Sequence, residues 1–229
     1  MAIWYADLAK LALDQERCYA VLDDAERAVL AKLRFQALRD QYLLSHGLLR
    51  MLLGSYLQVL PEALNLNRSA YGKPFLEDYP ALSFNMSHSA NKLLVAVTQE
   101  VPVGVDIEAM KPRTHTAGLV AKCFAAEEQG YWQNLPEPVK MRGFFDFWTR
   151  KEAFVKAVGQ GISLGLERCV IDPSDPTRFL RIPDHCGSID AWRVQDLVVD
   201  VSCCAAVVAK LREFKLKSFL INDYLARLN

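Results

Sequence analysis

The sequence has no excess of charge of either sign. Its 229 residues include 27 Lys and Arg and 27 Asp and Glu, so the formal net charge is zero. A chain without a global basic field is not expected to attract nucleic acid or an anionic membrane surface. We therefore expect neither partner, and an anionic ligand would need a local cluster of lysine and arginine.

Paired cysteine motifs and long apolar runs are also absent. The six cysteines contain no C-x-x-C pair, which argues against a zinc site or disulfide framework and favours reduced thiols in a cytoplasmic protein. Residues 1–16 have no basic segment followed by a long apolar stretch, so no secretory signal is expected. The longest apolar region, residues 197–209, is interrupted by Asp200 and is too short to span a bilayer as a helix.

Two common enzyme signatures are missing. No G-x-S-x-G motif is present, so a serine hydrolase is not expected. Gly72-Lys73-Pro74 forms a rigid turn that presents one lysine, but the G-x-x-x-x-G-K-[ST] pattern of a Walker A loop is lacking. The chemistry of the chain must therefore be sought in other polar residues.

The chain does contain enough apolar residues, 52%, to bury a substantial core. Apolar residues at helical spacing predict a helix from Asp23 or Asp24 to Leu33, and a long helix over residues 40–60 that ends at Pro61. Further helices are expected over residues 118–123, 126–134 and 140–158. Gly159 suits the left-handed backbone that ends the last of these helices.

Short strands are predicted between these helices, over residues 3–6, 82–87, 92–98, 101–107, 166–171, 191–194 and 197–208. The strands 92–98 and 101–107, joined at Gln99 and Glu100, are expected to form an antiparallel hairpin. A basic amphipathic stretch occupies residues 211–228.

The two halves of the chain, residues 1–110 and 111–229, are similar in kind. Each combines helices with short strands, which predicts an α+β fold of two similar lobes related by a pseudo-twofold axis. Each lobe is expected to pack a small antiparallel sheet against helices. A site for a small ligand is expected between the lobes.

Two carboxylates belong to the segment that contains the predicted strand 101–107. In Val103-Gly-Val-Asp106-Ile-Glu108, residues two apart point to one side, so Asp106 and Glu108 share a face while the apolar residues face the core. Neighbouring carboxylates repel each other, and a bound Mg²⁺ would remove that repulsion because hard cations prefer oxygen ligands. The alternative is a solvated strand edge beside a loop.

A third carboxylate, Glu152, lies on the predicted helix 140–158. Trp148, Glu152 and Lys156 are four residues apart and share a helix face, amid many aromatic residues. A buried glutamate needs a cation or a proton, so Glu152 is a candidate metal ligand or general base. Lys151, about 100° round the helix, could hold a phosphate beside it. The alternative is a weak surface Glu–Lys pair.

Two other polar groups are candidates for anion binding. The hydroxyls, amide and imidazole of Ser83-Phe-Asn-Met-Ser87-His88-Ser89 are typical of loops that bind phosphate, or alternatively of a capped polar turn. In the first helical region, basic side chains either form a solvated face or reach an anionic ligand; these are Lys32, Arg34, Arg39 and Arg50.

Four short segments in this order and spacing resemble the 4′-phosphopantetheinyl transferases, in particular the two-lobed, Sfp-like type. They are Gly72-Lys-Pro74, Phe84-Asn-Met-Ser-His-Ser89, Gly104-Val-Asp-Ile-Glu108 and Phe147-Trp-Thr-Arg-Lys-Glu-Ala-Phe-Val-Lys156, followed by Gly159-Gln-Gly-Ile162. The resemblance covers about residues 34–171. It implies transfer of 4′-phosphopantetheine from coenzyme A to a serine of an apo acyl or peptidyl carrier protein, with release of 3′,5′-ADP.

The resemblance also implies roles for the charged residues. Asp106, Glu108 and Glu152 would coordinate Mg²⁺ on the pyrophosphate of coenzyme A, and Glu152 would deprotonate the carrier serine. Lys156 would stabilise charge on the pyrophosphate, with Lys151 as a helper. Asp106, Glu152 and Lys156 are thus the expected catalytic residues, in agreement with the needs of phosphoryl transfer.

The remaining contacts with coenzyme A are also expected from the resemblance. Ser87 and His88 would meet its 3′-phosphate, and Lys73 its adenosine end. Many family members place arginines in the long first-lobe helix near the positions of Tyr42 and His46, where this chain offers Arg39 and Arg50 instead.

The carrier partners of the family are acidic, which calls for a basic and apolar surface near the cleft. Residues 119–132, with Lys122, Phe124 and Tyr131, are candidates for it, unless their apolar members are core. Two lobes in one chain favour a monomer.

Two other functions are compatible with parts of this pattern. The same three carboxylates would serve a Mg²⁺-dependent coenzyme A or nucleotide pyrophosphohydrolase that uses water in place of a serine. A non-enzymatic module that binds coenzyme A or a carrier domain would not need Glu152 within an aromatic-rich helix.

Overall fold

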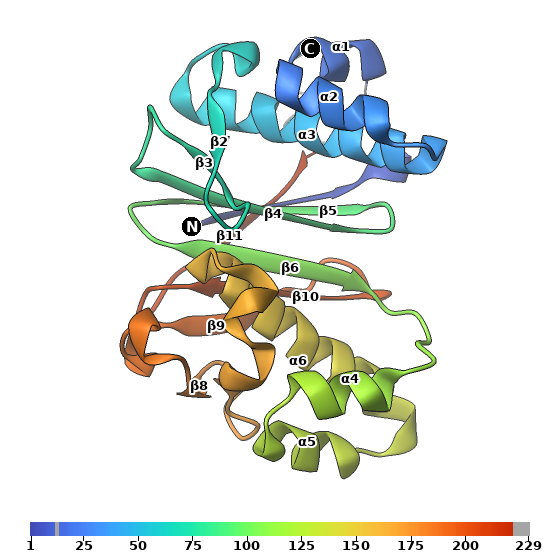
Figure 1. Ribbon diagram of the computed structural model, residues 1–229, viewed down its shortest axis with the longest axis vertical. Helices are drawn as coiled ribbons and strands as arrows, with labels where there is room; N and C mark the ends of the chain where they lie inside the picture. Colours follow the sequence, from blue (N-terminus) through green and yellow to red (C-terminus); the bar gives the residue numbers. More distant parts are fainter. Residues whose placement is uncertain (12–13, 222–229) are drawn as a thin grey trace.

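The first lobe is built on a four-stranded sheet with the strand order β11-β1-β5-β4 (Figure 1). Its strands are β1 (Ala2–Asp7), β4 (Leu82–Ser89), β5 (Lys92–Gln99) and β11 (Lys217–Leu220). β5 runs antiparallel to β1 and β4, whereas β11 is parallel to β1. The computed structural model describes residues 1–11 and 14–221. The predicted basic stretch 211–228 therefore contains β11, and its residues 222–228 lie outside the described residues.

Helices cover the outer face of this sheet: α1 (Gln15–Ala20), α2 (Asp24–Lys32) and α3 (Gln36–Leu57). As predicted, Asp23 caps the start of α2, and its side chain forms a capping box with Glu26. α3 ends where Gln58 adopts a left-handed φ of 57°, shortly before Pro61. Apolar side chains along α3 pack on β4 and β5 to form the first-lobe core. A hairpin of β2 (Leu66–Arg68) and β3 (Pro74–Leu76) lies beside it.

The second lobe has a three-stranded antiparallel sheet with the order β6-β10-β9. Its strands are β6 (Val103–Ala109), β9 (Arg193–Asp196) and β10 (Cys203–Ala209). The helices α4 (Thr116–Cys123), α5 (Ala126–Gln133) and α6 (Glu137–Val158) lie on its outer side. Gly159, with a φ of 84°, ends α6 as predicted.

Three predicted strands of this lobe are shorter or shifted. Of residues 166–171, only β7 (Val170–Ile171) is extended, and it pairs with β8 (Phe179–Arg181) in a separate small sheet. The strand expected over 191–194 is β9. The strand expected over 197–208 begins only at Cys203, because Asp200 accepts hydrogen bonds from Ser202 in a turn.

The predicted hairpin between residues 92–98 and 101–107 is wrong. β5 pairs with β1 and β4, whereas β6 pairs with β10. Both strands are buried on both faces, although β6 carries Asp106 on one of them, so neither sequence could specify the partner strand. The chain changes sheets between Gln99 and Val103, ahead of the expected division at residue 110.

A third core lies between the two sheets. Ile3, Leu94 and Ala96 of the first sheet face apolar residues of β6 and β10, including Val105 and Val207. The layers are thus helices, sheet, sheet and helices (Figure 1). Each lobe packs a helix of 22 residues, α3 or α6, on a small sheet, which confirms the predicted α+β fold with two lobes. No helix within the described ranges has the length and apolar character needed to cross a membrane.

Candidate active site

The site depends on the close contact between α6 and β6 at Gly104. A Cβ atom at this position would overlap the carbonyl oxygen of Ala153 and the amide nitrogen of Ala157 on α6. Glycine therefore lets the helix backbone lie directly on the strand. Because Glu152 and Lys156 adjoin this crossing and Asp106 follows Gly104 on the same face of β6, the contact brings their side chains together.

Asp106 is the most buried carboxylate of the site, with 4% of its surface exposed. Its Oδ1 accepts hydrogen bonds from Lys156 Nζ at 2.6 Å and from Ser87 Oγ at 2.8 Å. Its buried Oδ2 has no partner among the described residues. Burial raises the pKa of Asp106, and the Lys156 ammonium opposes that rise. The carboxylate is therefore held by one cation and has an oxygen left for another ligand.

Glu152 and Glu108 complete the acidic group. Burial, and then the charges of Asp106 and Glu108, raise the pKa of Glu152 to about 7 against the opposing effect of Lys156. Glu152 Oε1 is buried and also lacks a partner within the described ranges. Glu108 Oε2 accepts a hydrogen bond from Ser89 Oγ at 3.0 Å and lies 3.6 Å from Arg113 Nη2. The fold thus gathers the three carboxylates and Lys156, as the sequence predicts.

The donor set suits a hard divalent cation. Among the described residues, Asp106 Oδ2 and Glu152 Oε1 have no hydrogen-bond partner and lie beside like charges, and Mg²⁺ binds such oxygens. As the side chains stand, no group of three or more His, Cys, Asp or Glu residues in the described part of the chain is arranged to hold a metal ion. The Lys156 ammonium supplies the positive charge at Asp106 instead. The residues therefore fit a cation chemically, and their side chains would have to adjust to it.

Arg113 was missed from the sequence because its segment reads as an ordinary loop. Its guanidinium lies over the ring of Phe145, at 5.2 Å, and over that of Trp148, at 5.8 Å. These ring contacts hold the cation beside Glu108. Only the packing of the loop on α6 creates this arrangement, so no local sequence signal could have revealed it.

The structure contradicts the expected role of Lys151. Its side chain is fully buried in the second lobe, where Nζ lies 2.7 Å from Glu128 Oε2. The same ammonium donates to the carbonyl oxygens of Leu166 and Cys169 at 2.8 and 2.7 Å. All three ammonium donors are therefore used, and Lys151 cannot reach a phosphate at the site. Glu128, its buried partner, was not foreseen from the sequence.

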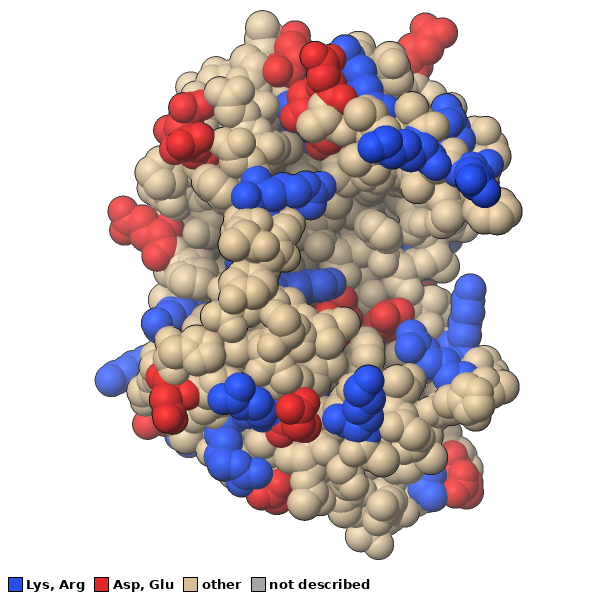
Figure 2. All heavy atoms as spheres, viewed as in Figure 1, with Lys and Arg blue, Asp and Glu red and all other residues tan. Residues whose placement is uncertain are grey.

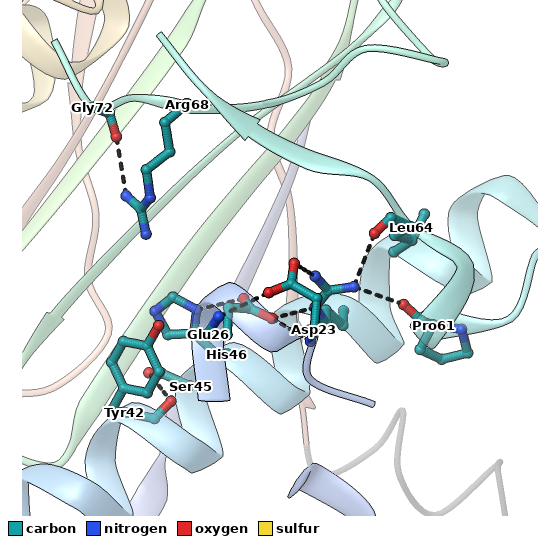
Figure 3. Close-up of polar contacts among 10 residues, drawn as sticks. Asp23, Glu26, Tyr42, Ser45, His46, Pro61, Leu64, Arg68 and Gly72 are labelled. Carbon is teal, nitrogen blue, oxygen red and sulfur yellow. Dashed lines mark hydrogen bonds and ion pairs between the residues drawn. The ribbon is translucent and has the colours of Figure 1, made fainter. Parts of the chain in front are cut away.

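The structure also contradicts the expected role of Arg50. This side chain is fully buried, forms ion pairs with Asp23 and Glu26, and donates to the carbonyl oxygens of Pro61 and Leu64. Figure 3 shows these partners, which come from the start of α2 and from the segment after α3, converging on one point. Because its charge is paired inside the lobe, Arg50 is not available to bind coenzyme A.

Arg39 also makes internal contacts. Its Nη1 donates to the carbonyl oxygens of Leu30 and Leu33, at the end of α2. A cation that the sequence did not single out, Arg68, reaches from the β2–β3 hairpin toward α3 and donates to the carbonyl oxygen of Gly72 (Figure 3).

Ser87 and His88 were expected to act together, but they point to opposite faces of β4. Ser87 is buried against β6, where it contacts Asp106 and Lys156. His88 lies on the other face, where its Nδ1 is 3.2 Å from Gln41 Nε2 of α3. Burial and the Lys156 charge lower the pKa of His88. Strand alternation excludes a shared contact of both side chains with one phosphate, so the expectation holds at most for His88.

Lys73 bridges the two lobes. Its Nζ donates to the carbonyl oxygens of Val103 at 3.1 Å and Ala157 at 3.0 Å. Burial lowers the pKa of Lys73 to about 8. The ammonium therefore ties the hairpin of the first lobe to the crossing of β6 and α6, and its expected contact with adenosine stays a prediction.

The candidate docking surface for a carrier is partly core. Phe124, with 1% of its surface exposed, belongs to the second-lobe core. Tyr131, in contrast, is 44% exposed, and Lys122 is exposed as well. The apolar share of this surface is therefore smaller than the sequence suggests.

The face drawn in Figure 2 is hollowed between the lobes, and acidic and basic side chains lie along the hollow. A cavity of about 220 Å³ in the first lobe is lined by Glu26, Tyr42, His46, Arg68 and Met86, among others. A larger cavity, of about 840 Å³, is lined by Tyr56, Leu82 and Phe219 and by none of the charged site residues. Size alone therefore does not identify the ligand site.

Comparison with known proteins defines the class of this chain. Residues 102–207 match the model of the 4′-phosphopantetheinyl transferase superfamily, and residues 12–100 match that of the 4′-phosphopantetheinyl transferase N-terminal domain. The chain belongs to the 4′-phosphopantetheinyl transferase superfamily and is an enzyme of this class.

Several curated relatives extend over most of the chain. The 4′-phosphopantetheinyl transferase HetI of Nostoc sp. is 32% identical over 209 residues, which cover 90% of this chain and 85% of the relative. The transferase psf-1 of Bacillus pumilus is 34% identical over 163 residues, 70% of this chain and 68% of the relative. The transferase Sfp of Bacillus subtilis is 26% identical over 163 residues, 71% of each chain. The resemblance expected from the sequence motifs is confirmed.

Proposed function

We propose that this enzyme transfers 4′-phosphopantetheine from coenzyme A to a serine of an apo acyl or peptidyl carrier protein, with Mg²⁺ as cofactor. The observation that supports it most is the meeting of Asp106, Glu152 and Lys156, with two buried carboxylate oxygens unpartnered within the described ranges. Phosphoryl transfer needs opposite charge at the phosphate and a base near the attacking hydroxyl. This cluster contains groups for both tasks.

Each residue then has a defined task. Glu152, with its pKa raised to about 7, accepts the proton of the carrier serine, directly or through water. The serine oxygen bonds to the phosphorus that carries pantetheine, the bond from this phosphorus to the bridging oxygen breaks, and 3′,5′-ADP leaves. Lys156 stabilises negative charge on the pyrophosphate. Asp106, Glu108 and Glu152 would hold Mg²⁺, which would supply positive charge for the pyrophosphate.

The nucleotide end of coenzyme A is assigned to the first lobe. The cavity of about 220 Å³ is lined by Arg68, Pro74 and Met86, and His88 follows Met86 on the same face of β4. Arg68 supplies a cation for a phosphate and His88 a ring nitrogen, so these residues replace Arg39, Arg50 and Ser87 as the candidates for the 3′-phosphate.

The carrier is assigned to the second lobe. The exposed residues Lys122 and Tyr131 offer a cation and an aromatic surface to an acidic partner. Both lobes of the site belong to the same chain, as the family models matched over residues 12–100 and 102–207 also indicate, which supports a monomeric enzyme.

Mass spectrometry of an apo carrier incubated with the protein, coenzyme A and Mg²⁺ tests the proposal. We expect the carrier to gain the mass of one phosphopantetheine, and the gain to disappear in chelator. Free phosphopantetheine released without a carrier would instead indicate a pyrophosphohydrolase. Binding of coenzyme A without either product would indicate a binding module. Activity that persists in chelator would overturn the metal assignment.

A further inference from the structure

One edge of β6 is joined to the first lobe by side chains. Its other edge pairs with β10, while β4 pairs with β5 in the described part of the chain. Facing β4, Val105 N donates to Asn85 Oδ1 at 2.8 Å, and Ile107 N donates to Ser87 Oγ at 3.4 Å. Ala109 N donates to Ser89 Oγ at 3.1 Å. Three alternate side chains of β4 thus accept from three alternate amides of β6.

The two serines of this ladder also hold the two carboxylates of β6. Ser87 Oγ donates to Asp106 Oδ1 at 2.8 Å, and Ser89 Oγ donates to Glu108 Oε2 at 3.0 Å. A hydroxyl can donate once and accept twice, so one serine can bind an amide and a carboxylate together. The spacing of Ser87 and Ser89 matches that of Asp106 and Glu108, one serine to each carboxylate.

Ser87 has no hydrogen-bonding capacity left for a substrate. It donates to Asp106 and accepts from Lys156 Nζ at 2.9 Å and from Ile107 N. These three bonds use its single donor and both acceptor positions. With 6% of its surface exposed, it is also closed off from solvent. The hydroxyl therefore orients the Asp106–Lys156 pair and is not available to a phosphate.

We propose that Ser87 and Ser89 are positioning residues, which set the register of β6 against the first lobe and thereby fix Asp106 and Glu108 for the reaction. The inference rests on the proposed function, and it predicts that the two serines affect the rate of the chemical step rather than the binding of coenzyme A. His88, which lies between them in sequence but on the opposite face of β4, is left to coenzyme binding.

Alanine substitutions with two readouts test this assignment. One readout is kcat for transfer to an apo carrier, and the other is the Kd of 3′,5′-ADP, which carries the 3′-phosphate. We expect Ser87→Ala to lower kcat roughly 10- to 100-fold, the effect of a lost hydrogen bond to a charged group, with the Kd unchanged within about twofold. Ser89→Ala should show the same split with a smaller loss. His88→Ala should instead raise the Kd by roughly tenfold.

Ser83→Ala is the matched control. Ser83 lies on the same face of β4, but it has no hydrogen bond to β6 among the described residues, so this variant should match the wild type in both readouts. The assignment is overturned if Ser87→Ala keeps its kcat, or if it raises the Kd of 3′,5′-ADP as much as His88→Ala does. If Ser87→Ala unfolds at the assay temperature, the test uses Ser89→Ala instead, with the same comparison of kcat and the Kd of 3′,5′-ADP.

Hydrogen exchange of residues 103–109 tests the ladder without reference to activity. Exchange in this segment should accelerate in Ser87→Ala and Ser89→Ala but not in Ser83→Ala, because only the first two variants remove an acceptor of a β6 amide. Unchanged exchange in both serine variants would overturn the ladder. A wild-type protein that transfers no phosphopantetheine would overturn the proposed function alone.

Discussion

Buried charges are fully paired in the interiors of the two lobes but incompletely paired in the cleft between them. Inside the first lobe, Arg50 forms ion pairs with Asp23 and Glu26 and donates hydrogen bonds to two carbonyl oxygens. Inside the second lobe, Lys151 forms an ion pair with Glu128 and also donates to two carbonyl oxygens. These charges are each paired and hydrogen-bonded, as buried charges must be in a stable fold. Both groups tie segments that are distant in sequence to the long helices α3 and α6.

Between the lobes, the acidic groups outnumber their partners. Asp106 and Glu152 each have a buried oxygen without a partner in the described part of the chain, and both lie near Glu108. Such an arrangement lowers the stability of the free protein and is typical of a functional site. The comparison shows that paired charges hold this fold, while incompletely paired charges lie at the site proposed to bind the ligand.

The largest effect is expected at the carboxylate that is least well paired. Glu152→Gln should lower kcat by roughly 10²- to 10⁴-fold, the usual contribution of a general base. Burial raises the pKa of Glu152 to about 7, so ionisation costs the folded protein stability as the pH rises from 4.5 through 7. The variant should therefore be no less stable at pH 8 without divalent cation, which urea unfolding would check. Transfer at the wild-type rate would refute the mechanism.

The opposite outcome is expected for the fully paired lysine of the second lobe. Lys151→Met leaves Glu128 buried without its cation, so the free energy of unfolding should fall by about 3–5 kcal/mol. Its kcat per folded molecule should stay near that of the wild type. The control is the double variant Lys151→Met/Glu128→Gln, which removes both charges and should recover part of the stability. A loss of kcat without a loss of stability would support a direct role of Lys151 at the active site.

Gly104→Ala tests how the cleft is assembled. The added methyl group must push α6 away from β6, which should cost about 1–3 kcal/mol of stability and also lower kcat because Glu152 and Lys156 move with the helix. Thermal unfolding and kcat measure the two effects. Gly118→Ala is the matched control, since nothing lies within 4 Å of the added atom. Equal results for both variants would contradict the role assigned to the crossing.

The smallest effect concerns Lys73, whose ammonium contacts carbonyl oxygens at the junction of the lobes. Burial lowers its pKa from 10.5 to about 8, so between these pH values the unfolded chain binds more protons than the folded protein. Stability contributed by this group therefore rises with pH across that window, by about 1–2 kcal/mol after allowance for partial exposure. In Lys73→Met, the free energy of unfolding measured with urea should no longer rise between pH 8 and 10.5. If its dependence on pH is unchanged, the lowered pKa of Lys73 is contradicted.

Much of the fold was predictable because its signals are local. The capping box at Asp23, the apolar spacing along α3 and the glycine at the end of α6 each act within a few residues. Alternation along β6 correctly placed Asp106 and Glu108 on one side of the strand. The pairing of β5 and β6 failed as a prediction because both strands are buried on two faces, and neither the apolar run of β5 nor the alternation of β6 indicates which strand lies beside it.

The sequence by itself determined the longer helices, several of the strands and the residue types proposed to serve metal-assisted phosphoryl transfer. Only the tertiary structure decided which charges reach the site. Lys151 and Lys156 share α6, yet one is buried with Glu128 and the other contacts Asp106. Ser87 and His88 are neighbours in sequence, yet they face different elements. The physical reason is that a side chain's role depends on what packs against its face of the helix or strand, and distant segments supply those partners.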